Sequence, residues 1–302
     1  MLTGVHILLT YKCTMECDHC FVHSGPFVPG VMTLAQVRGL VSQARDLGTV
    51  RWIYFEGGEP FLYHALLLEG VRLAREAGFR VGVVTNCYWA VSDQDAELWL
   101  RPLAELGLAD LALSDDAFHH GENAQTPAGL ALDAARALGI PATTIRIQKP
   151  FAEAAPGQGQ DKGAAVVGGG AMFRGRAVDT LAPDLPGRPW AELARCPHEE
   201  LAAPGRVHVD PYGNVHVCQG LSLGNLFERP LAELMAAYDP AAHPVCGPLV
   251  EGGPALLARR YGIEPDARYV DECHLCYCLR RALVDRFPDH LAPRQVYGLQ
   301  EA

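Results

Sequence analysis

The stretch Tyr11-Lys-Cys13-Thr-Met-Glu-Cys17-Asp-His-Cys20 decides how the rest of this sequence is interpreted. Its cysteines are separated by three and then by two residues. Three thiolates at this spacing can bind three corners of one 4Fe–4S cube and leave the fourth iron without a protein ligand. An iron with an open position can bind and activate a small molecule. The stretch therefore predicts a cluster that takes part in chemistry.

Three other interpretations of these cysteines stay open at this point. A structural zinc ion needs four ligands, and His19 or His23 could supply the fourth. Alternatively, two thiols could form a disulfide beside a free one, or all three could be buried apolar side chains. The next motif along the chain bears on this choice.

That second motif is Trp52-Ile-Tyr-Phe55-Glu-Gly57-Gly58-Glu59-Pro60, an apolar strand that runs into two glycines, a carboxylate and a proline. Two glycines let the backbone pass close to a ligand, and the proline fixes the direction of exit. Together the two motifs resemble those of the radical SAM superfamily. The resemblance implies that the open iron chelates S-adenosylmethionine (SAM), which is cleaved reductively to a 5'-deoxyadenosyl radical.

The resemblance also implies roles for individual residues. It implies three ligands for the SAM-binding 4Fe–4S cluster, namely Cys13, Cys17 and Cys20. It further implies a set of cofactor-binding residues, namely His19, Gly57, Gly58, Glu59, Pro60, Asn86 and Ser114. Among these, His19 occupies the position that usually carries an aromatic side chain near the adenine. Asn86 could hydrogen-bond the cofactor or the substrate.

Polar residues after two expected strands are candidates for catalysis. Asp115 and Asp116 lie where a strand end would face the barrel mouth, so a carboxylate or the nearby His119 could hold the ribose or move a proton. Cys87 could give a hydrogen atom to a substrate radical, as a cysteine does in some peptide epimerases of this superfamily. The alternatives are a solvated loop for the Asp–His stretch and a buried apolar thiol for Cys87.

Apolar strands alternate with amphipathic helices through the first half, which predicts an α/β fold with a parallel sheet. Strands are expected at 5–9, 50–55, 80–85, 111–114 and 143–148, and helices after Thr33 and at about 64–77, 93–106 and 128–138. Thr33 and Gln36 form a capping-box pattern. The resemblance implies a partial (β/α)6 TIM-like barrel with its active site at the carboxyl ends of the strands.

The second half has cysteines of its own. Cys196 is followed by alternating stretches at 207–210 and 215–218 with turn residues between them, which predicts a β-hairpin ending at Cys218. The thiol-rich segment 271–278 is expected to form a compact turn. This order resembles the auxiliary-cluster domains called twitch and SPASM. The resemblance implies a second 4Fe–4S cluster on four cysteines, namely Cys196, Cys218, Cys273 and Cys276, with Cys246 and Cys278 as alternates.

A zinc site built by the same four cysteines is the alternative to this auxiliary cluster, because zinc also prefers a tetrahedron of thiolates. We expect the radical SAM barrel to cover residues 1–185 and the auxiliary-cluster domain to cover 186–302. Between residues 150 and 170 the chain is rich in Gly, Ala and Gln and shows no periodicity, so a flexible loop is expected there.

Composition limits the class of protein. The 302 residues are 49% hydrophobic and 20% charged, which is typical of a globular chain. The formal charge of -10 argues against a nucleic-acid partner, because phosphate binding relies on clustered Lys and Arg. No apolar run reaches the roughly 18 residues that span a bilayer, and no secretory signal is visible, so we expect a cytoplasmic location without a membrane partner. Ten cysteines in clustered spacings then favour metal over disulfides.

These observations lead us to expect a radical SAM oxidoreductase that uses reduced flavodoxin or ferredoxin as electron donor. Twitch-bearing relatives include a dehydrogenase of an aminocyclitol alcohol, so we expect a small-molecule substrate whose remaining electron passes to the auxiliary cluster. One alternative is a peptide maturase or epimerase, although the few residues before Cys13 leave no room for a leader-binding segment. The other is a non-catalytic iron–sulfur or zinc protein.

Overall fold

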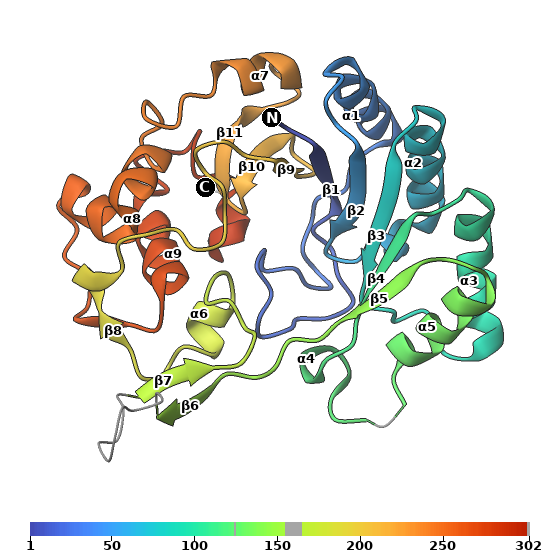
Figure 1. Ribbon diagram of the computed structural model, residues 1–302, viewed down its shortest axis with the longest axis horizontal. Coiled ribbons are helices and arrows are strands. Elements are labelled where there is room, and N and C mark those ends of the chain that lie inside the picture. The colour runs from blue at the N-terminus through green and yellow to red at the C-terminus, as the bar shows by residue number, and fades with distance from the viewer. Residues whose placement is uncertain (124, 155–164, 301–302) are drawn as a thin grey trace.

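In the computed structural model, which describes residues 1–123, 125–154 and 165–300, one sheet of eight strands extends through both halves of the chain (Figure 1). Its order is β11-β10-β9-β1-β2-β3-β4-β5. The strands are β1 (Gly4–Thr10), β2 (Trp52–Gly57), β3 (Arg80–Thr85), β4 (Asp110–Ser114), β5 (Ala142–Ile145), β9 (Arg206–Val209), β10 (Asn214–Cys218) and β11 (Leu221–Asn225). Two short ladders lie outside it, β6 (Phe151–Ala154) with β7 (Ala165–Gly168) and β8 (Arg188–Pro189) with β12 (Arg268–Tyr269).

Strand direction divides this sheet into a parallel and an antiparallel part. Strands β1 to β5 are parallel in chain order, and β9 joins the free edge of β1, also in parallel. Strands β9, β10 and β11 then continue as an antiparallel meander. The predicted α/β partial barrel is confirmed. In the described residues, however, its sixth parallel strand is β9 from the second half and not a strand that follows β5.

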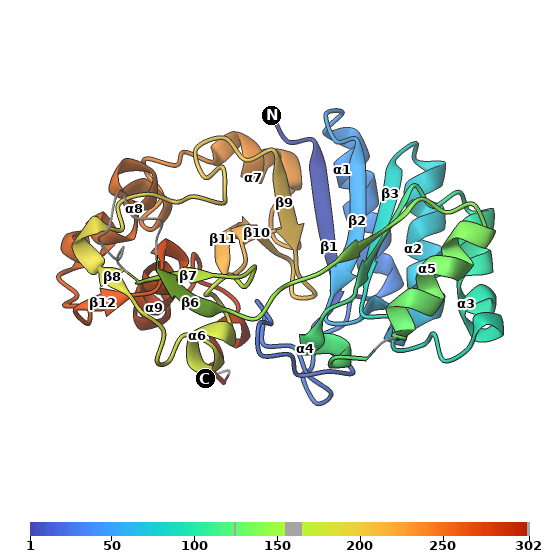
Figure 2. The same ribbon diagram turned by 60° about the horizontal axis from the view of Figure 1, so that its bottom comes forward.

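Helices cover the outer face of the parallel strands. The helices are α1 (Leu34–Asp46), α2 (His64–Glu76), α3 (Asp93–Glu105), α4 (Ala117–His120), α5 (Pro127–Ala137), α6 (Ala177–Thr180), α7 (Leu231–Ala237), α8 (Cys246–Tyr261) and α9 (Glu272–Leu283), with 3-10 turns η1 (Pro60–Tyr63), η2 (Trp190–Glu192) and η3 (Arg294–Tyr297). Figure 2 shows α1, α2, α3 and α5 together on one side of β1 to β3, while α8 and α9 lie across the molecule. None of the helices within the described residues is long and apolar enough to cross a membrane.

The predicted capping box opens α1. The Thr33 hydroxyl accepts a hydrogen bond from the Gln36 backbone N–H, and the Gln36 side chain accepts one from the Thr33 N–H. Two of the otherwise unpaired N–H groups at this helix end are thereby satisfied. The helix buries Val37, Leu40 and Val41 against the sheet, so its apolar stripe positions β1 and β2 beneath it.

The alternation of side chains along β2 separates the hydrophobic core from the interior of the barrel. Ile53 and Phe55 are fully buried under the helices. Trp52, Tyr54 and Glu56 are only partly buried and point to the opposite face. The inner face of the sheet therefore carries two aromatic side chains and a carboxylate that are not packed into the core.

Two expected elements are corrected by the structure. Residues 151–154 and 165–168 of the supposed flexible loop pair as β6 and β7, whereas 155–164 lie outside the described residues. Every residue of β6 is exposed, so this strand has no alternation of buried and exposed side chains. A strand of this kind leaves no hydrophobic pattern in the sequence. The supposed turn at 271–278 is the first part of α9, capped by Asp271, whose carboxylate accepts from the His274 N–H. The cysteine spacing obscured this helix.

The domain boundary predicted between residues 185 and 186 stays a prediction. The sheet itself crosses that boundary, because β9 pairs with β1. The hairpin expected before Cys218 is present as β9 and β10, which pair antiparallel. The second half is thus joined to the first by backbone hydrogen bonds along one edge of the barrel.

Candidate active site

A chamber of about 390 Å³ lies where the carboxyl ends of the parallel strands meet the loop after β1. All three cysteines of the first motif, Cys13, Cys17 and Cys20, line it. So do five of the seven residues predicted to bind the cofactor, namely His19, Gly57, Gly58, Asn86 and Ser114. Ligands bind at this edge in parallel α/β folds, since loops from several strands converge there.

The chain supplies hydrogen-bond donors to the sulfur atoms of this loop. Cys13 Sγ accepts from the Met15 N–H and from Asn86 Nδ2, each at 3.4 Å. Cys20 Sγ accepts from the Ser24 N–H at 3.3 Å. Burial raises the pKa of Cys13 to about 11, so its thiol is neutral until a metal displaces the proton. Such donors stabilise cluster-bound thiolates, and this loop therefore fits a 4Fe–4S cluster.

The glycine pair is required by the loop that crosses it. This loop follows β1 and carries Cys13, Cys17 and Cys20, and we call it the cluster loop. A Cβ atom on Gly57 would lie 2.4 Å from the Thr10 carbonyl oxygen, and one on Gly58 would lie 2.1 Å from that of Lys12. The Gly58 and Glu59 N–H groups donate to these same two carbonyls at 2.7 and 2.9 Å. The glycines thus allow backbone to pack on backbone, which places the cysteines beside the strand end.

Gly58→Ala is expected to destabilise the protein by about 1–3 kcal/mol, because the new methyl group overlaps the Lys12 backbone. It should also lower the iron content after cluster reconstitution, since the loop that carries Cys13 must shift. Chemical denaturation and iron analysis measure the two effects. Gly39→Ala is the matched control, as nothing lies within 4 Å of its Cβ in α1, and it should be neutral or stabilising. Equal behaviour of the two variants would contradict the packing argument.

Glu59 and Pro60 are not among the residues that line the chamber, and their predicted contact with the cofactor stays a prediction. The Glu59 carboxylate is buried and accepts from the Phe61 N–H at 3.0 Å, the Thr85 hydroxyl at 2.9 Å and the Asn86 N–H at 2.7 Å. Burial raises its pKa to about 7. Glu59 therefore ties the turn after β2 to the end of β3, and so positions Asn86.

His19 lines the chamber wall, and its predicted place near the adenine stays a prediction. It stacks on Phe118 with ring centroids 4.4 Å apart, and its Nε2 lies 4.0 Å from an Asp116 oxygen. Asp116 caps α4 and accepts from His119 Nδ1 at 2.8 Å. Burial lowers the pKa of His19 to about 4, so the imidazole is neutral near pH 7. Asp116 thus positions the His19 and His119 rings. Both rings line the chamber, whereas Asp116 does not.

The other two catalytic candidates, Asp115 and Cys87, do not reach the chamber. Asp115 accepts hydrogen bonds from Arg146 at 2.6 Å and from the Thr126 hydroxyl at 2.7 Å. These bonds join the end of β4 to the residue after β5 and to the N-cap of α5. Cys87 is fully buried, and its thiol donates to the Thr85 carbonyl at 3.6 Å. Burial also raises the Cys87 pKa. The placement corresponds to the buried-thiol alternative for Cys87.

The chamber wall includes ionisable residues that sequence reasoning missed. They are His6 from β1, Glu56 from β2, Arg206 and His208 from β9, and Arg174 from the segment before α6. A carboxylate at an alternate position of an otherwise apolar strand is the sequence signal that could have found Glu56. His208 reaches this wall only because β9 pairs with β1, and that pairing has no local signature.

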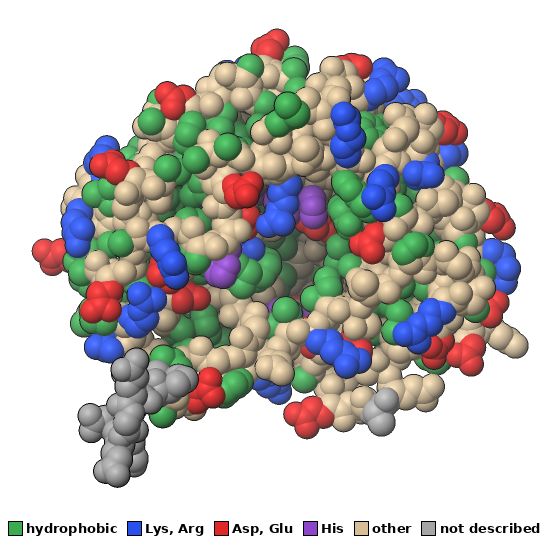
Figure 3. Space-filling view, in the orientation of Figure 1, with side chains coloured by type: hydrophobic (Ala, Val, Ile, Leu, Met, Phe, Trp, Pro, Cys, Tyr) green, Lys and Arg blue, Asp and Glu red, His purple; other side chains and the backbone are tan. Residues whose placement is uncertain are grey.

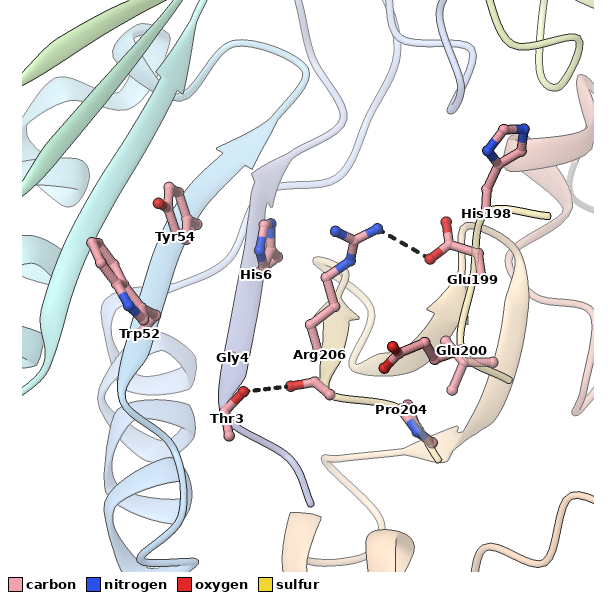
Figure 4. Close-up of a pocket in the computed structure, with 12 residues that line it drawn as sticks. Thr3, Gly4, His6, Trp52, Tyr54, His198, Glu199, Glu200, Pro204 and Arg206 are labelled. Atoms are coloured by element: carbon pink, nitrogen blue, oxygen red, sulfur yellow. Dashed lines mark hydrogen bonds and ion pairs between the residues drawn. The ribbon is translucent and has the colours of Figure 1, made fainter. Parts of the chain in front are cut away.

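A second cavity of about 640 Å³ adjoins the chamber and shares His6 and Arg206 with it. Figure 3 shows the molecule hollowed at its centre, with histidine, basic and acidic side chains around the opening. In Figure 4 the His6, Tyr54 and Trp52 rings follow one another along β1 and β2. Neighbouring rings are stacked, with centroids 4.9 and 5.4 Å apart. Arg206 faces them and binds Glu199 at 3.1 Å.

The four cysteines predicted to bind the auxiliary cluster line one small cavity in the second half. They are Cys196, Cys218 at the end of β10, and Cys273 and Cys276 on one face of α9. The alternates Cys246 and Cys278 do not line it. Cys246 is fully buried in α8, and Cys278 lies two residues beyond Cys276, on another side of the helix. The helix thus brings Cys273 and Cys276 to this cavity, and their role as cluster ligands stays a prediction.

Two buried arginines border this cavity. Arg174 Nη1 donates to Cys218 Sγ at 3.3 Å and to Glu199 at 3.0 Å, and its guanidinium lies 4.2 Å from the centre of the Phe21 ring. Arg280 donates to the Gln219 carbonyl at 3.0 Å. Arg174 lines both this cavity and the chamber. One positive side chain therefore borders both cavities that the two groups of cysteines line.

Comparison with known proteins agrees with this geometry. Residues 7–147 match the sequence profile of the Radical SAM superfamily. Fold and site together thus define a radical SAM domain, which confirms the predicted family resemblance and implies a 4Fe–4S cluster and SAM as cofactors.

Particular relatives share parts of this domain. YydG of Bacillus subtilis (strain 168) is 28% identical over 115 residues, which are 38% of this chain and 36% of that protein. The S-adenosylmethionine-dependent nucleotide dehydratase of Selenomonas ruminantium is 33% identical over 86 residues, 28% of this chain and 30% of that protein. The matches thus span only about a third of these relatives. The crystal structure of BtrN in complex with AdoMet and 2-DOIA has a similar fold, with a TM-score of 0.54, 16% identity and 92% of each chain covered.

Proposed function

We propose that this protein is a radical SAM oxidoreductase that removes hydrogen from a small molecule in the chamber. SAM, bound at the iron left open by Cys13, Cys17 and Cys20, supplies the 5'-deoxyadenosyl radical on reduction, for which reduced flavodoxin or ferredoxin is the proposed donor. The radical takes one hydrogen atom from a substrate carbon. Completing a two-electron oxidation then requires that one proton and one electron leave the substrate.

The observation that carries this proposal is the second group of cysteines beside the chamber. Cys196, Cys218, Cys273 and Cys276 surround one cavity, and four thiolates are a complete set for an auxiliary 4Fe–4S cluster. A cluster without an open iron suits electron transfer. Because Arg174 lines both cavities, an electron acceptor in the second would lie close to a substrate in the first.

Other residues of the chamber would order the cluster loop and bind the cofactor and the substrate. Asn86, which donates to Cys13 Sγ and also to the Thr14 hydroxyl, orders the cluster loop. The neutral His19 ring provides a flat surface for a base such as adenine. The aromatic and charged residues along β1 and β2 offer stacking and hydrogen bonds to a polar substrate that enters from the larger cavity.

The test is to incubate the anaerobically reconstituted protein with SAM, dithionite and a low-molecular-mass metabolite extract. We expect one compound to lose two hydrogens in an amount equal to the 5'-deoxyadenosine formed, as seen by mass spectrometry. Regeneration of SAM with a product that is not oxidised would overturn the proposal. So would a modification found only when a peptide fraction replaces the extract, which would indicate a peptide maturase.

Arg174→Gln should lower the reduction potential of the auxiliary cluster by on the order of tens of millivolts, because a buried positive charge and a hydrogen bond to Cys218 Sγ both favour the reduced state. Redox titration followed by electron paramagnetic resonance (EPR) measures this potential. Arg281→Gln is the control, since Arg281 lies on α9 outside the cavity and pairs with Asp179. An equal shift in both variants would contradict a specific role of Arg174.

A further inference from the structure

Three ligand-type side chains meet on the inner face of the sheet, apart from both groups of cysteines. In the parallel pair of β1 and β9, His6 lies directly beside His208. In the pair of β1 and β2, Glu56 lies beside Leu8. Leu8 is two residues after His6 in β1, so Glu56 and His6 lie on the same face of the sheet. Three adjacent strands thus supply one residue each. Strand positions hold side chains more rigidly than loops do.

Each histidine lies at a distance from Glu56 that is typical of two ligands around one ion. His6 Nδ1 lies 2.9 Å from Glu56 Oε2, and His208 Nδ1 lies 2.8 Å from Glu56 Oε1. The three residues each offer one ligand atom within 4.8 Å of the other two. Ligands about 2.1 Å from a metal and at right angles to each other are about 3 Å apart, which is close to both His–Glu distances. Small movements of the side chains would complete the arrangement.

The charge of this group also suits a cation. Burial acts to raise the pKa of Glu56, but the His6 and His208 rings outweigh it and hold that pKa well below its usual range, so Glu56 is a carboxylate. Burial lowers the pKa of His208 and so favours its neutral imidazole, while the Glu56 carboxylate acts in the opposite direction. Neutral imidazole and ionised carboxylate are the forms that bind metal. The Nε2 atom of His208 has no hydrogen-bond partner in the described part of the chain, so Nδ1 carries the polar contact of this ring.

We propose that His6, Glu56 and His208 bind one divalent first-row transition metal ion. Two imidazoles and one carboxylate on one side of an ion are the ligand set of iron(II) oxygenase sites, and they also suit manganese, cobalt and zinc. All three residues line the chamber, so the remaining coordination positions face the space where the substrate would lie. A metal there would orient a substrate oxygen or nitrogen as a Lewis acid.

Binding of this ion does not require the radical chemistry, because none of its ligands belongs to either group of cysteines, whereas its role toward the substrate rests on the proposed function. A hydrogen-bonded cluster in which Glu56 accepts from both Nδ1–H groups is the competing explanation, since it satisfies the same distances. The two differ in one respect. Only the metal site requires all three side chains for the binding of an added ion.

The test is a titration of the reconstituted, chelator-washed protein with Mn²⁺, with the clusters kept oxidised and free Mn²⁺ followed by EPR. We expect the wild type to bind one equivalent, and His6→Ala, Glu56→Gln and His208→Ala to bind it about 100-fold more weakly or not at all. His64→Gln is the control, because His64 on α2 packs on Phe61 and Trp99 outside both cavities.

Circular dichroism and iron content of each variant show whether it has folded, and Glu56→Gln changes the shape of the site least. Failure of the wild type to bind Mn²⁺ would overturn the proposal. Equal affinity of the wild type and Glu56→Gln would do the same, and would leave Glu56 as a hydrogen-bond acceptor for the two histidines. Because no SAM is added, these outcomes are separate from any failure to form 5'-deoxyadenosine.

Discussion

Replacing Cys13, Cys17 and Cys20 together by alanine should abolish the formation of 5'-deoxyadenosine from SAM and dithionite. The three thiols line one chamber beside the glycine turn, and without them no cluster can present an open iron to SAM. The iron content after reconstitution should fall from roughly eight to roughly four per chain, since the second group of cysteines is untouched. Mass spectrometry of the nucleoside and colorimetric iron analysis measure the two quantities.

Cys87→Ala is the matched control for that variant. Cys87 is also a buried cysteine next to the chamber, but its thiol bonds to the Thr85 carbonyl and does not line the wall. It should retain iron and 5'-deoxyadenosine formation close to wild type. If the triple variant still produced 5'-deoxyadenosine, the first motif would not be the site of SAM cleavage. If the wild type produced none with both clusters intact, the non-catalytic interpretation would be favoured.

The second large effect is expected from Cys273→Ala combined with Cys276→Ala. This variant should lose the auxiliary cluster and the oxidised product, yet still cleave SAM, because the first motif lies in a separate cavity. Its thermal stability should also fall, since a metal that ties α9 to β10 contributes directly to the folding of the second half. Iron analysis, 5'-deoxyadenosine formation and thermal denaturation measure these effects in one preparation.

Cys278→Ala is the control here, as it lies on the same helix but outside the cavity, and it should behave like the wild type. Zinc in place of iron in the wild-type protein would contradict an auxiliary cluster and support the zinc alternative. Product formation that survives the double substitution would show that the electron leaves the substrate by another route. Either result leaves the prediction for the first motif intact.

Much of the active site was accessible from local sequence. The spacing of Cys13, Cys17 and Cys20 and the turn at Gly57 and Gly58 lie within short segments, so the pattern itself contains the geometry. The role of Glu59 was less accessible. Its three hydrogen-bond donors come from residues 61, 85 and 86, and only the folded chain shows that they converge on one carboxylate instead of on a ligand.

The auxiliary site illustrates the same limit. Sequence order suggested Cys196, Cys218, Cys273 and Cys276, yet it left Cys246 and Cys278 open as alternates. For Cys278 the difference depends on α9, where side chains three residues apart share a face and those two apart do not. Cys246 lies on α8 and does not line the cavity. Leu275, Leu279 and Leu283 are buried along this helix at a spacing of four, a helical signal that the dense cysteines concealed.

The sequence by itself determined the class of domain, the cluster loop, the glycine turn and the alternation of strands and helices, because each depends on residues close together in the chain. Only the tertiary structure decided that β9 pairs with β1, about 200 residues away in sequence, and that His208 therefore lies beside His6 and Glu56. Strand pairing depends on which edge is free and which face must be buried, and no local segment carries that information. Local sequence thus predicted the cysteines of the chamber, whereas the place of His6, Glu56 and His208 in its wall could be seen only in the folded structure.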